Sequence, residues 1–266
     1  MITGKNGSGT IFFSGCNLRC IYCQNHVISD GSTGCELDEN RLIDIMFELR
    51  DSGAHNINLV TPSHYIHLLP STLYKAKAAG LDIPIIYNTS AYEDVSKLKE
   101  LSGLVDVYLP DYKYHRSEPA AKYSSAPDYP EVARRAIDEM FRQQSHCTFT
   151  THNNICLITN GVIVRHMVLP LATGNSMDAI EYLYNHYKDD IYISIMSQYT
   201  PVNDSLPYPE LRRKVTGREY NKVVEYSLSL GITNAYIQEG KVAESSFIPD
   251  FCDYPELSRS PYHDSI

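Results

Sequence analysis

Short apolar segments alternate with longer amphipathic segments along most of this 266-residue chain. Apolar runs bounded by turn residues predict strands, whereas apolar residues spaced three or four apart predict helices. The predicted strands cover residues 10–14, 56–61, 83–88, 105–109, 162–169 and 191–196, and a last short strand covers 232–237. Strands that alternate with helices in this way favour parallel pairing through right-handed crossovers, and therefore an α/β fold.

The predicted helices carry typical faces and end signals. The buried face of one predicted helix consists of Leu42, Ile43, Ile45, Met46 and Leu49. A second predicted helix has Pro130 in its first turn, and its buried face consists of Val132, Ala133, Ala136, Ile137 and Met140. Further helices are predicted over 71–79, 93–101 and 176–187, and before Gly231. Gly80 stands in the C-cap place after 71–79, and Thr216 with Glu219 predicts a capping box for the last helix.

The stretch before the fifth long strand is less regular. Residues 148–151 and 155–159 are predicted to be short strands joined by Asn153-Asn154. Asn160-Gly161 is a typical tight-turn pair, so we expect a turn there before the strand over 162–169.

Six strand–helix units predict an incomplete barrel, a partial (β/α)6 TIM-type barrel with a parallel sheet, and not the closed eightfold form. No linker and no repeat beyond the strand–helix unit is evident, so we expect one domain over residues 1–266. In such folds ligands bind at the carboxyl ends of the strands. The loop after the first strand therefore lies where chemistry is expected.

Composition excludes several classes of function. No run of 18 or more apolar residues predicts a membrane span. The formal net charge of −9 argues against a general affinity for nucleic acid or anionic membranes. Seven cysteines, only three of them in a tight motif, and no secretory signal at the start predict a reducing, cytoplasmic location. We expect most of the 21 tyrosines to be half-buried packing residues.

The loop after the first strand carries Cys16, Cys20 and Cys23. Thiolates suit iron–sulfur clusters, and three of them on a four-iron cluster leave one iron without a protein ligand. Such an open position is typical of catalytic metal sites. Cys35, twelve residues beyond the motif, could act as a fourth ligand and close the site. The alternative is thus a non-catalytic iron–sulfur or zinc-binding protein.

This loop, with Tyr22 before its last cysteine, resembles that of the radical S-adenosylmethionine (SAM) enzymes. The stretch from Gly9 to Ser29 is similar to the pyruvate formate-lyase activating enzyme branch, and in particular to its activating-enzyme-like proteins. The resemblance implies a [4Fe-4S] cluster on Cys16, Cys20 and Cys23 and the same partial barrel. Proteins of this branch often carry an additional N-terminal segment, so we expect a short form or a fragment here.

The resemblance also implies a reaction and partners. The amino and carboxylate groups of SAM bind the free iron, and reductive cleavage of SAM yields a 5′-deoxyadenosyl radical. This radical abstracts hydrogen from a glycyl radical enzyme or from a small molecule. Flavodoxin or ferredoxin is the expected electron donor.

Candidate SAM contacts follow the predicted strands. They are Thr61, Ser63 and His64 after the second strand, Asn88, Thr89 and Ser90 after the third, Asp111 and Lys113 after the fourth, Arg165 in the fifth, and Gln198 after the sixth. The resemblance implies that Lys113 and Arg165 contact the SAM carboxylate and act in catalysis. In the activating enzymes an Asp and a Thr after the third strand help to hold a small cation; Asn88 in place of the Asp weakens such a site here, and Asp111 could contribute to it.

The chain departs from the family pattern at several of these positions. Ser63 and its neighbours stand where activating enzymes have Gly-Gly-Glu, Asn88 replaces an Asp, and Leu171 replaces a Gly. Structural roles also fit these residues: Thr61 or Ser63 as helix caps, Asp111 with Lys113 as a salt pair, and Arg165 paired with Asp111. His166 points opposite to Arg165 and is predicted to be a packing residue.

Overall fold

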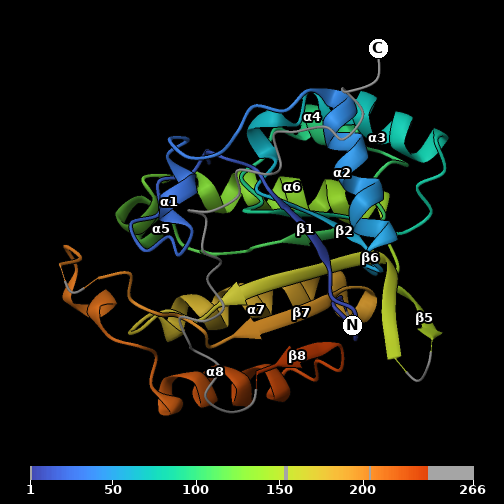
Figure 1. Cartoon of the computed structure of the whole chain (residues 1–266). Helices are drawn as coiled ribbons and strands as arrows, with labels where there is room; N and C mark the ends of the chain where they lie inside the picture. Colours follow the sequence, from blue (N-terminus) through green and yellow to red (C-terminus); the bar gives the residue numbers. More distant parts are fainter. Residues whose placement is uncertain (1, 153–154, 204, 239–266) are drawn as a thin grey trace.

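A computed structural model describes residues 2–152, 155–203 and 205–238. In this part of the chain eight strands form one sheet (Figure 1). The strands are β1 (Gly9–Phe12), β2 (Ile57–Val60), β3 (Ile85–Thr89), β4 (Val107–Pro110), β5 (Thr148–His152), β6 (Ile155–Met167), β7 (Tyr192–Met196) and β8 (Ala235–Ile237). The helices are α1 (His26–Ser29), α2 (Glu39–Asp51), α3 (Leu69–Ala78), α4 (Val95–Lys99), α5 (Ser117–Ser124), α6 (Tyr129–Gln143), α7 (Thr173–Tyr187) and α8 (Gly217–Ser229). Short 3-10 turns cover Ser63–Tyr65, Lys188–Asp190 and Pro209–Arg212.

Seven of the described strands run parallel in the order β1-β2-β3-β4-β6-β7-β8. The short β5 pairs with β6 in the antiparallel direction, off this path. Because β1 and β8 lie at opposite ends of the order, the sheet is an open, partial barrel. This confirms the predicted α/β class, and the last short strand predicted over 232–237 is present as β8, the seventh parallel strand.

The predicted elements are found with small shifts at their ends. The capping box of α8 is present, since Thr216 accepts from the Glu219 backbone and the Glu219 carboxylate accepts from the Thr216 backbone. Gly80 adopts φ +98° directly after the cap of α3, as its predicted place requires. The helix expected to start at residue 93 begins only at Val95, and α5 was not predicted at all.

The turn predicted at Asn160-Gly161 is wrong, because β6 runs without interruption from Ile155 to Met167. Gly161 has φ +131°, and a Cβ there would lie 2.5 Å from the Cys147 sulfur. The glycine is therefore needed for the close approach of the neighbouring chain, not for a reversal. The strands around Asn153-Asn154 do pair as expected, although these two residues lie outside the described part of the chain.

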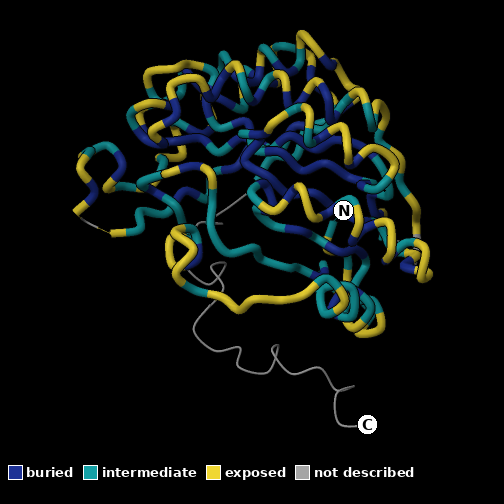
Figure 2. Tube along the Cα trace, turned by 90° about the horizontal axis from the view of Figure 1, so that it is seen from above, coloured by how far each residue is buried: buried dark blue, intermediate teal, exposed yellow. Residues whose placement is uncertain are grey.

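The interior contains more tyrosine than the sequence suggested. Tyr87, Tyr108, Tyr112, Tyr114 and Tyr129 are each fully buried, in contrast to the expected half-buried positions. Figure 2 shows the buried strands inside a shell of exposed helix faces and loops. Because the chain has no Trp, tyrosine supplies the largest core side chains. Each buried phenol needs a hydrogen-bond partner, so the core is crossed by polar contacts.

The carboxyl ends of the parallel strands lie at one side of the molecule. In Figure 1 the arrows of β6 and β7 point toward the side where α1 and α5 lie. The cysteine loop joins β1 to α1 on this side. No helix in the described part of the chain is long and apolar enough to cross a membrane.

Candidate functional site

Three non-glycine residues with a left-handed backbone follow strands at this edge of the sheet. Among the described residues, Thr61 after β2 has φ +57°, Ala91 after β3 has φ +62°, and Leu171 after β6 has φ +58°. A β-branched residue such as Thr61 rarely adopts this conformation, and strained backbone gathers at ligand sites. Leu171, which stands where relatives have a glycine, takes a backbone conformation that favours glycine, and its side chain is exposed.

The cysteine loop is held at its start by His64. Gly15 has φ +90°, and a Cβ there would lie 2.9 Å from His64 Nε2. The same nitrogen lies 2.5 Å from the carbonyl oxygen of Ser14 and donates to it. Leu18, only 3 % exposed, anchors the loop in the core. The structure thus places the predicted SAM contact His64 against the loop that carries the cysteines.

The donor set of the loop fits an iron–sulfur cluster. Cys16, Cys20 and Cys23 are free and half-buried, and their charges act on one another. Among the described residues, no group of three or more His, Cys, Asp or Glu is arranged to hold a single metal ion. A zinc site needs its ligands about 2.3 Å from one ion, whereas a cluster takes each thiolate on a separate iron. Cys35 is exposed, which gives no support to a closed site.

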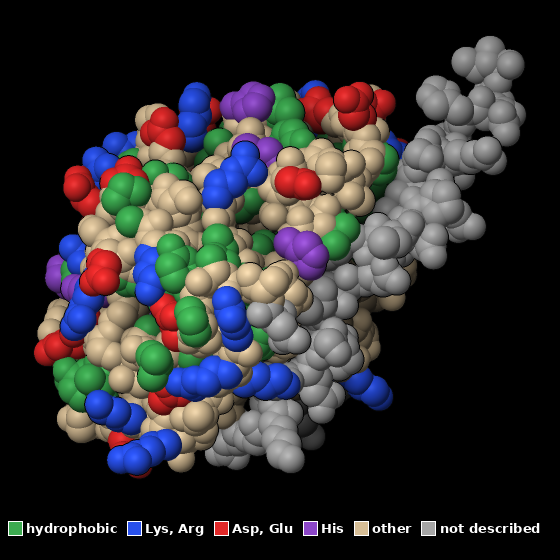
Figure 3. All heavy atoms as spheres, turned by 90° about the vertical axis from the view of Figure 1, so that its left-hand side faces the viewer, with side chains coloured by type: hydrophobic (Ala, Val, Ile, Leu, Met, Phe, Trp, Pro, Cys, Tyr) green, Lys and Arg blue, Asp and Glu red, His purple; other side chains and the backbone are tan. Residues whose placement is uncertain are grey.

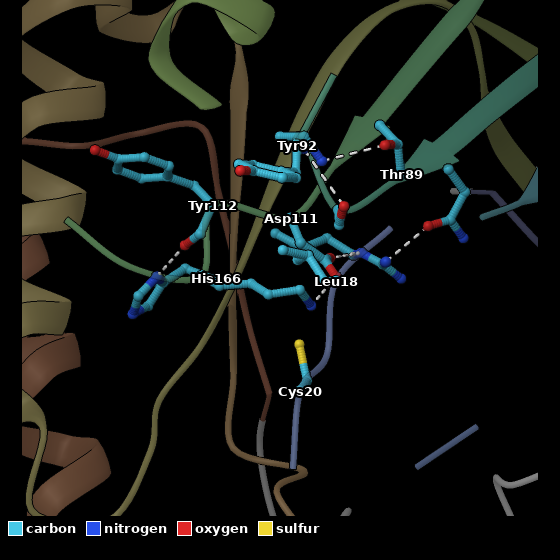
Figure 4. A network of polar contacts seen from close by, with 12 residues as sticks. Leu18, Cys20, Thr89, Tyr92, Asp111, Tyr112 and His166 are labelled. Carbon is cyan, nitrogen blue, oxygen red and sulfur yellow. Dashed lines mark hydrogen bonds and ion pairs between the residues drawn. The ribbon is translucent and has the colours of Figure 1, made fainter. Parts of the chain in front are cut away.

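The cysteine loop faces a positive charge. Burial raises the pKa of the Cys20 thiol to about 11, and the nearby charge of Lys113 acts in the opposite direction. Burial also raises the pKa of Cys16, again opposed by Lys113. In Figure 4 the sulfur of Cys20 points toward the polar contacts around Asp111. The thiolates that a cluster needs therefore depend on bound iron and on Lys113 for compensation.

A polar cluster of four predicted residues lies beside this loop. Asp111 accepts from Lys113 Nζ and from Arg165 Nε, each at 2.7 Å. Arg165 Nη2 donates to Asn88 Oδ1, also at 2.7 Å. Asp111 and Lys113 thus face the same way, as the alternation of an extended segment predicts. The pairing of Arg165 with Asp111, one of the two predicted alternatives, is present.

The charges in this cluster do not balance. Desolvation disfavours the Asp111 carboxylate, but the charges of Arg165 and Lys113 outweigh it and hold the pKa of Asp111 below its ordinary value. Desolvation likewise acts against the Lys113 ammonium, but Asp111 raises the pKa of Lys113 above its ordinary value. Two cations therefore share one carboxylate, and the cluster has a surplus positive charge that suits an anionic ligand.

The expected small cation finds no support at this cluster. The carboxylate of Asp111 and the amide oxygen of Asn88 already accept from Arg165 or Lys113. A metal ion bound to these oxygens would face two positive side chains. The bonds to Arg165 and Lys113 give no support to a cation here, and the small cation stays a prediction.

A buried carboxylate that the sequence did not reveal organises the neighbouring strand ends. Glu93 Oε1 accepts from Ser63 Oγ at 2.6 Å, from Tyr87 at 3.1 Å, and from Thr89. Burial raises the pKa of Glu93 above its ordinary value, although these donors oppose the shift. The predicted SAM contacts Ser63 and Thr89 thus lie together on Glu93, and neither caps a long helix. Glu93 was missed because it was placed in the first turn of a helix that begins at Val95.

The remaining predicted contacts lie at other points of the same edge. The backbone of Thr61 donates to the carbonyl of Asn88 at 2.8 Å, which joins the ends of β2 and β3. Ser90 accepts from Tyr129 through its carbonyl at 2.9 Å. Gln198 accepts from Gln24 of the cysteine loop through its carbonyl at 3.3 Å, and from Gln238 through its side chain at 3.2 Å. Gln198 therefore connects the loop to the ends of β7 and β8.

His166 packs on the other face of β6, as predicted. It is fully buried, and its Nδ1 lies 2.6 Å from the carbonyl of Tyr112, to which it donates. Desolvation lowers the pKa of His166 to about 4, so the ring is neutral in the folded chain. Figure 4 shows this contact on the far side of the strand from Cys20.

Comparison with known proteins finds a match over the segment that carries the cysteine loop. A family model described as a 4Fe-4S single cluster domain matches residues 2–126, which include the cysteine loop. The uncharacterized protein MJ0674 of Methanocaldococcus jannaschii is 28 % identical over 234 residues, which cover 84 % of this chain. The chain spans 64 % of the length of that relative.

Solved structures with the same fold have little sequence in common with this chain. SuiB of Streptococcus suis bound to the precursor peptide SuiA matches 86 % of this chain and 48 % of its own, with a TM-score of 0.58 at 12 % identity. SuiB bound to S-adenosylmethionine matches with a TM-score of 0.56 at 13 % identity, over 88 % of this chain and 47 % of its own. The FeFe-hydrogenase maturase HydG of Carboxydothermus hydrogenoformans matches 83 % and 51 %, with a TM-score of 0.55 at 14 % identity. The chain therefore has the α/β fold of the radical SAM TIM-type barrels, with a 4Fe-4S single-cluster match over its cysteine loop.

Proposed function

We propose that this chain is a radical SAM enzyme that holds a [4Fe-4S] cluster through Cys16, Cys20 and Cys23. When bound, the reduced cluster supplies the electron that cleaves SAM to a 5′-deoxyadenosyl radical, which abstracts hydrogen from the substrate. The 4Fe-4S match over residues 2–126 and the SAM-bound structure of SuiB support this proposal.

One observation carries the proposal: Lys113 is shared between the cysteine loop and the polar cluster. Its charge acts on Cys16 and Cys20, and its Nζ lies 2.7 Å from Asp111. A ligand that places a carboxylate beside a cluster iron would meet both cations, Lys113 and Arg165, at once. SAM is such a ligand, since its amino and carboxylate groups chelate the iron in the enzymes that this chain resembles.

The chain's own residues have distinct roles in this proposal. Lys113 and Arg165 bind the SAM carboxylate, and Asp111 and Asn88 orient them through the bonds described above. Ser63 and Thr89, which Glu93 holds in place, and the left-handed backbone at Thr61 are proposed to lie beside SAM. His64, Ser90 and Gln198 line the same edge and are proposed to contact the rest of SAM, directly or through the cysteine loop.

The substrate is proposed to be either a polypeptide, such as a glycyl radical enzyme, or a small molecule. SuiB, which has the same fold, binds a precursor peptide, and this favours a polypeptide. The electron donor is proposed to be a flavodoxin or a ferredoxin. Figure 3, which looks onto the end of the molecule with the cysteine loop, shows Lys and Arg side chains gathered over the lower part of that face. Such charges would attract a donor with an acidic docking face.

Anaerobic reconstitution tests the proposal. The chain is expected to bind four irons and four sulfides, to change its EPR signal when SAM is added, and to form 5′-deoxyadenosine with dithionite. Cys20→Ala is expected to lose the open cluster and all product. Cys35→Ala is the matched control, because Cys35 is exposed and the proposal gives it no iron.

Two outcomes would contradict the proposal. If Cys35→Ala loses the cluster as fully as Cys20→Ala, the site has four protein ligands and the non-catalytic alternative holds. If SAM leaves the EPR signal of the wild-type cluster unchanged, no iron is open to it.

A further inference from the structure

Three buried hydroxyl groups form a chain of hydrogen bonds that ends on the sulfur of Cys20. Ser124 Oγ donates to Cys20 Sγ at 2.9 Å. The hydroxyl of Tyr114 lies 2.7 Å from Ser124 Oγ, and the hydroxyl of Tyr22 lies 2.6 Å from that of Tyr114. Ser124 and Tyr114 are at most 1 % exposed, and Tyr22 is 4 % exposed. No pattern in the sequence predicted this contact, which joins residues 104 positions apart.

The direction of these hydrogen bonds follows from the acceptor at their end, the sulfur of Cys20. A cysteine thiolate that binds iron can only accept, so Ser124 must donate to it. The oxygen of Ser124 then accepts from Tyr114, and the oxygen of Tyr114 accepts from Tyr22. The ordinary pKa of a phenol is about 10, so both tyrosines keep their protons at neutral pH. All three protons point toward the sulfur, and hydrogen bonds aligned in this way strengthen one another.

The backbone fixes Ser124 beside Cys20. The amide of Ile21 donates to the carbonyl of Tyr123 at 2.9 Å, and the amide of Arg19 donates to the carbonyl of Ser124 at 3.4 Å. These bonds lie on both sides of Cys20 in the sequence and hold the end of α5 against the cysteine loop. The two carbonyls at the helix end are thereby paired, so the group that faces the sulfur is the Ser124 hydroxyl.

We propose, on the basis of the function proposed above, that Ser124 with Tyr114 and Tyr22 raises the reduction potential of the cluster held by Cys20. Reduction adds one electron from a one-electron donor, which is dithionite in the experiment below. The added negative charge spreads onto the thiolates, and a donor to sulfur stabilises the reduced form more than the oxidised form. The hydroxyl protons remain on their oxygens, and no bond is broken. Ser124 is thus a positioning residue that acts through Cys20.

Redox titration of the reconstituted chain, followed by EPR, tests this inference. Ser124→Ala is expected to lower the equilibrium constant for one-electron reduction about tenfold, which is a shift of about 59 mV to more negative potential. Tyr114→Phe is expected to shift the potential in the same direction by less, and Tyr22→Phe by less again, because each removes a more distant proton. Ser124→Thr keeps the hydroxyl and is expected to restore the wild-type potential.

Tyr123→Phe is the matched control, because Tyr123 lies on the same helix and donates to Glu210 at 2.7 Å, outside the chain of bonds to Cys20. Its potential is expected to equal that of the wild type. If Ser124→Ala and Tyr114→Phe also keep the wild-type potential, or if Tyr123→Phe shifts as far as they do, the inference fails. If Ser124→Ala binds too little iron and sulfide for a redox titration, the potential of Tyr114→Phe decides whether the inference holds, because this variant keeps the ring in place.

The inference can fail independently of the function on which it rests. A wild-type chain that binds no four-iron cluster, or forms no deoxyadenosine, would overturn the proposed function. A wild-type chain that does both, with potentials that none of these variants shifts, would overturn only the role of Ser124, Tyr114 and Tyr22.

Discussion

At the scale of single residues, Asp111 is a carboxylate that two cations share. Removing its charge in Asp111→Asn leaves Lys113 and Arg165 without a counterion in a site where their side chains are 18 % and 27 % exposed. We expect a loss of about 2–3 kcal/mol in the free energy of unfolding of the metal-free chain, less than for a fully buried pair. Urea unfolding at neutral pH measures it. Asp82→Asn, at an exposed position in the loop before β3, is the control and is expected to change stability by less than about 0.5 kcal/mol.

His166 should make stability depend on pH. Its pKa is about 4 in the folded chain and about 6.5 in the unfolded chain. Between these two pH values the ring is therefore protonated in the unfolded state and neutral in the folded state. Stability is therefore complete above about pH 6.5 and falls as the pH drops toward 4, by about 2 kcal/mol between pH 8 and pH 5.

His166→Asn tests this dependence, because its amide can donate to the Tyr112 carbonyl as Nδ1 does, but it does not titrate. Urea unfolding at pH 8 and pH 5 is expected to show a smaller loss for the variant than for the wild type. Equal losses in the two proteins would mean that other groups control the acid response.

At the scale of elements, the packing of β6 depends on Gly161. Gly161→Ala is expected to destabilise the chain by about 2–3 kcal/mol, because the new Cβ meets Cys147 at 2.5 Å and φ is +131°. Gly217→Ala is the matched control. Its Cβ would have nothing within 4 Å at the start of α8, and alanine there is expected to be neutral or to stabilise by up to about 1 kcal/mol. Thermal unfolding compares the two, and similar changes in both variants would contradict this account of β6.

The same glycine shows how far the sequence determines the elements. The parallel strands could be predicted because each is a local apolar run, and β3 is buried at all five positions. The cysteine loop could be recognised in the sequence because the spacing of its cysteines is local. The turn predicted at Asn160-Gly161 was wrong because it rested on a local preference of these two residues. The conformation of Gly161 is decided by its contact with Cys147, which only the fold brings about. The contacts of Glu93 and Ser124 likewise join distant segments, and no local pattern encodes them.

At the scale of the whole molecule, the cysteine loop spans the open mouth of the barrel. The loop follows the edge strand β1, yet Gln24 donates to Gln198 beyond β7, and the rings of Tyr22 and Tyr199 lie 5.9 Å apart in an edge-to-face contact. Its backbone also bonds to the end of α5. The two edges of the sheet do not pair with each other in the described part of the chain, so this loop connects them instead.

Cluster assembly should therefore order three distant segments together. Hydrogen exchange of the reconstituted chain is expected to slow over residues 13–25, 117–125 and 197–203 relative to the metal-free chain, because the contacts of the loop reach all three. Residues 148–151 of β5, which Figure 1 shows at the opposite side from α1, serve as the internal reference and are expected not to change. A chain with Ala at positions 16, 20 and 23, treated in the same way, should show no slowing. Protection limited to residues 16–23 would mean that the loop binds its cluster without connecting the two edges of the barrel.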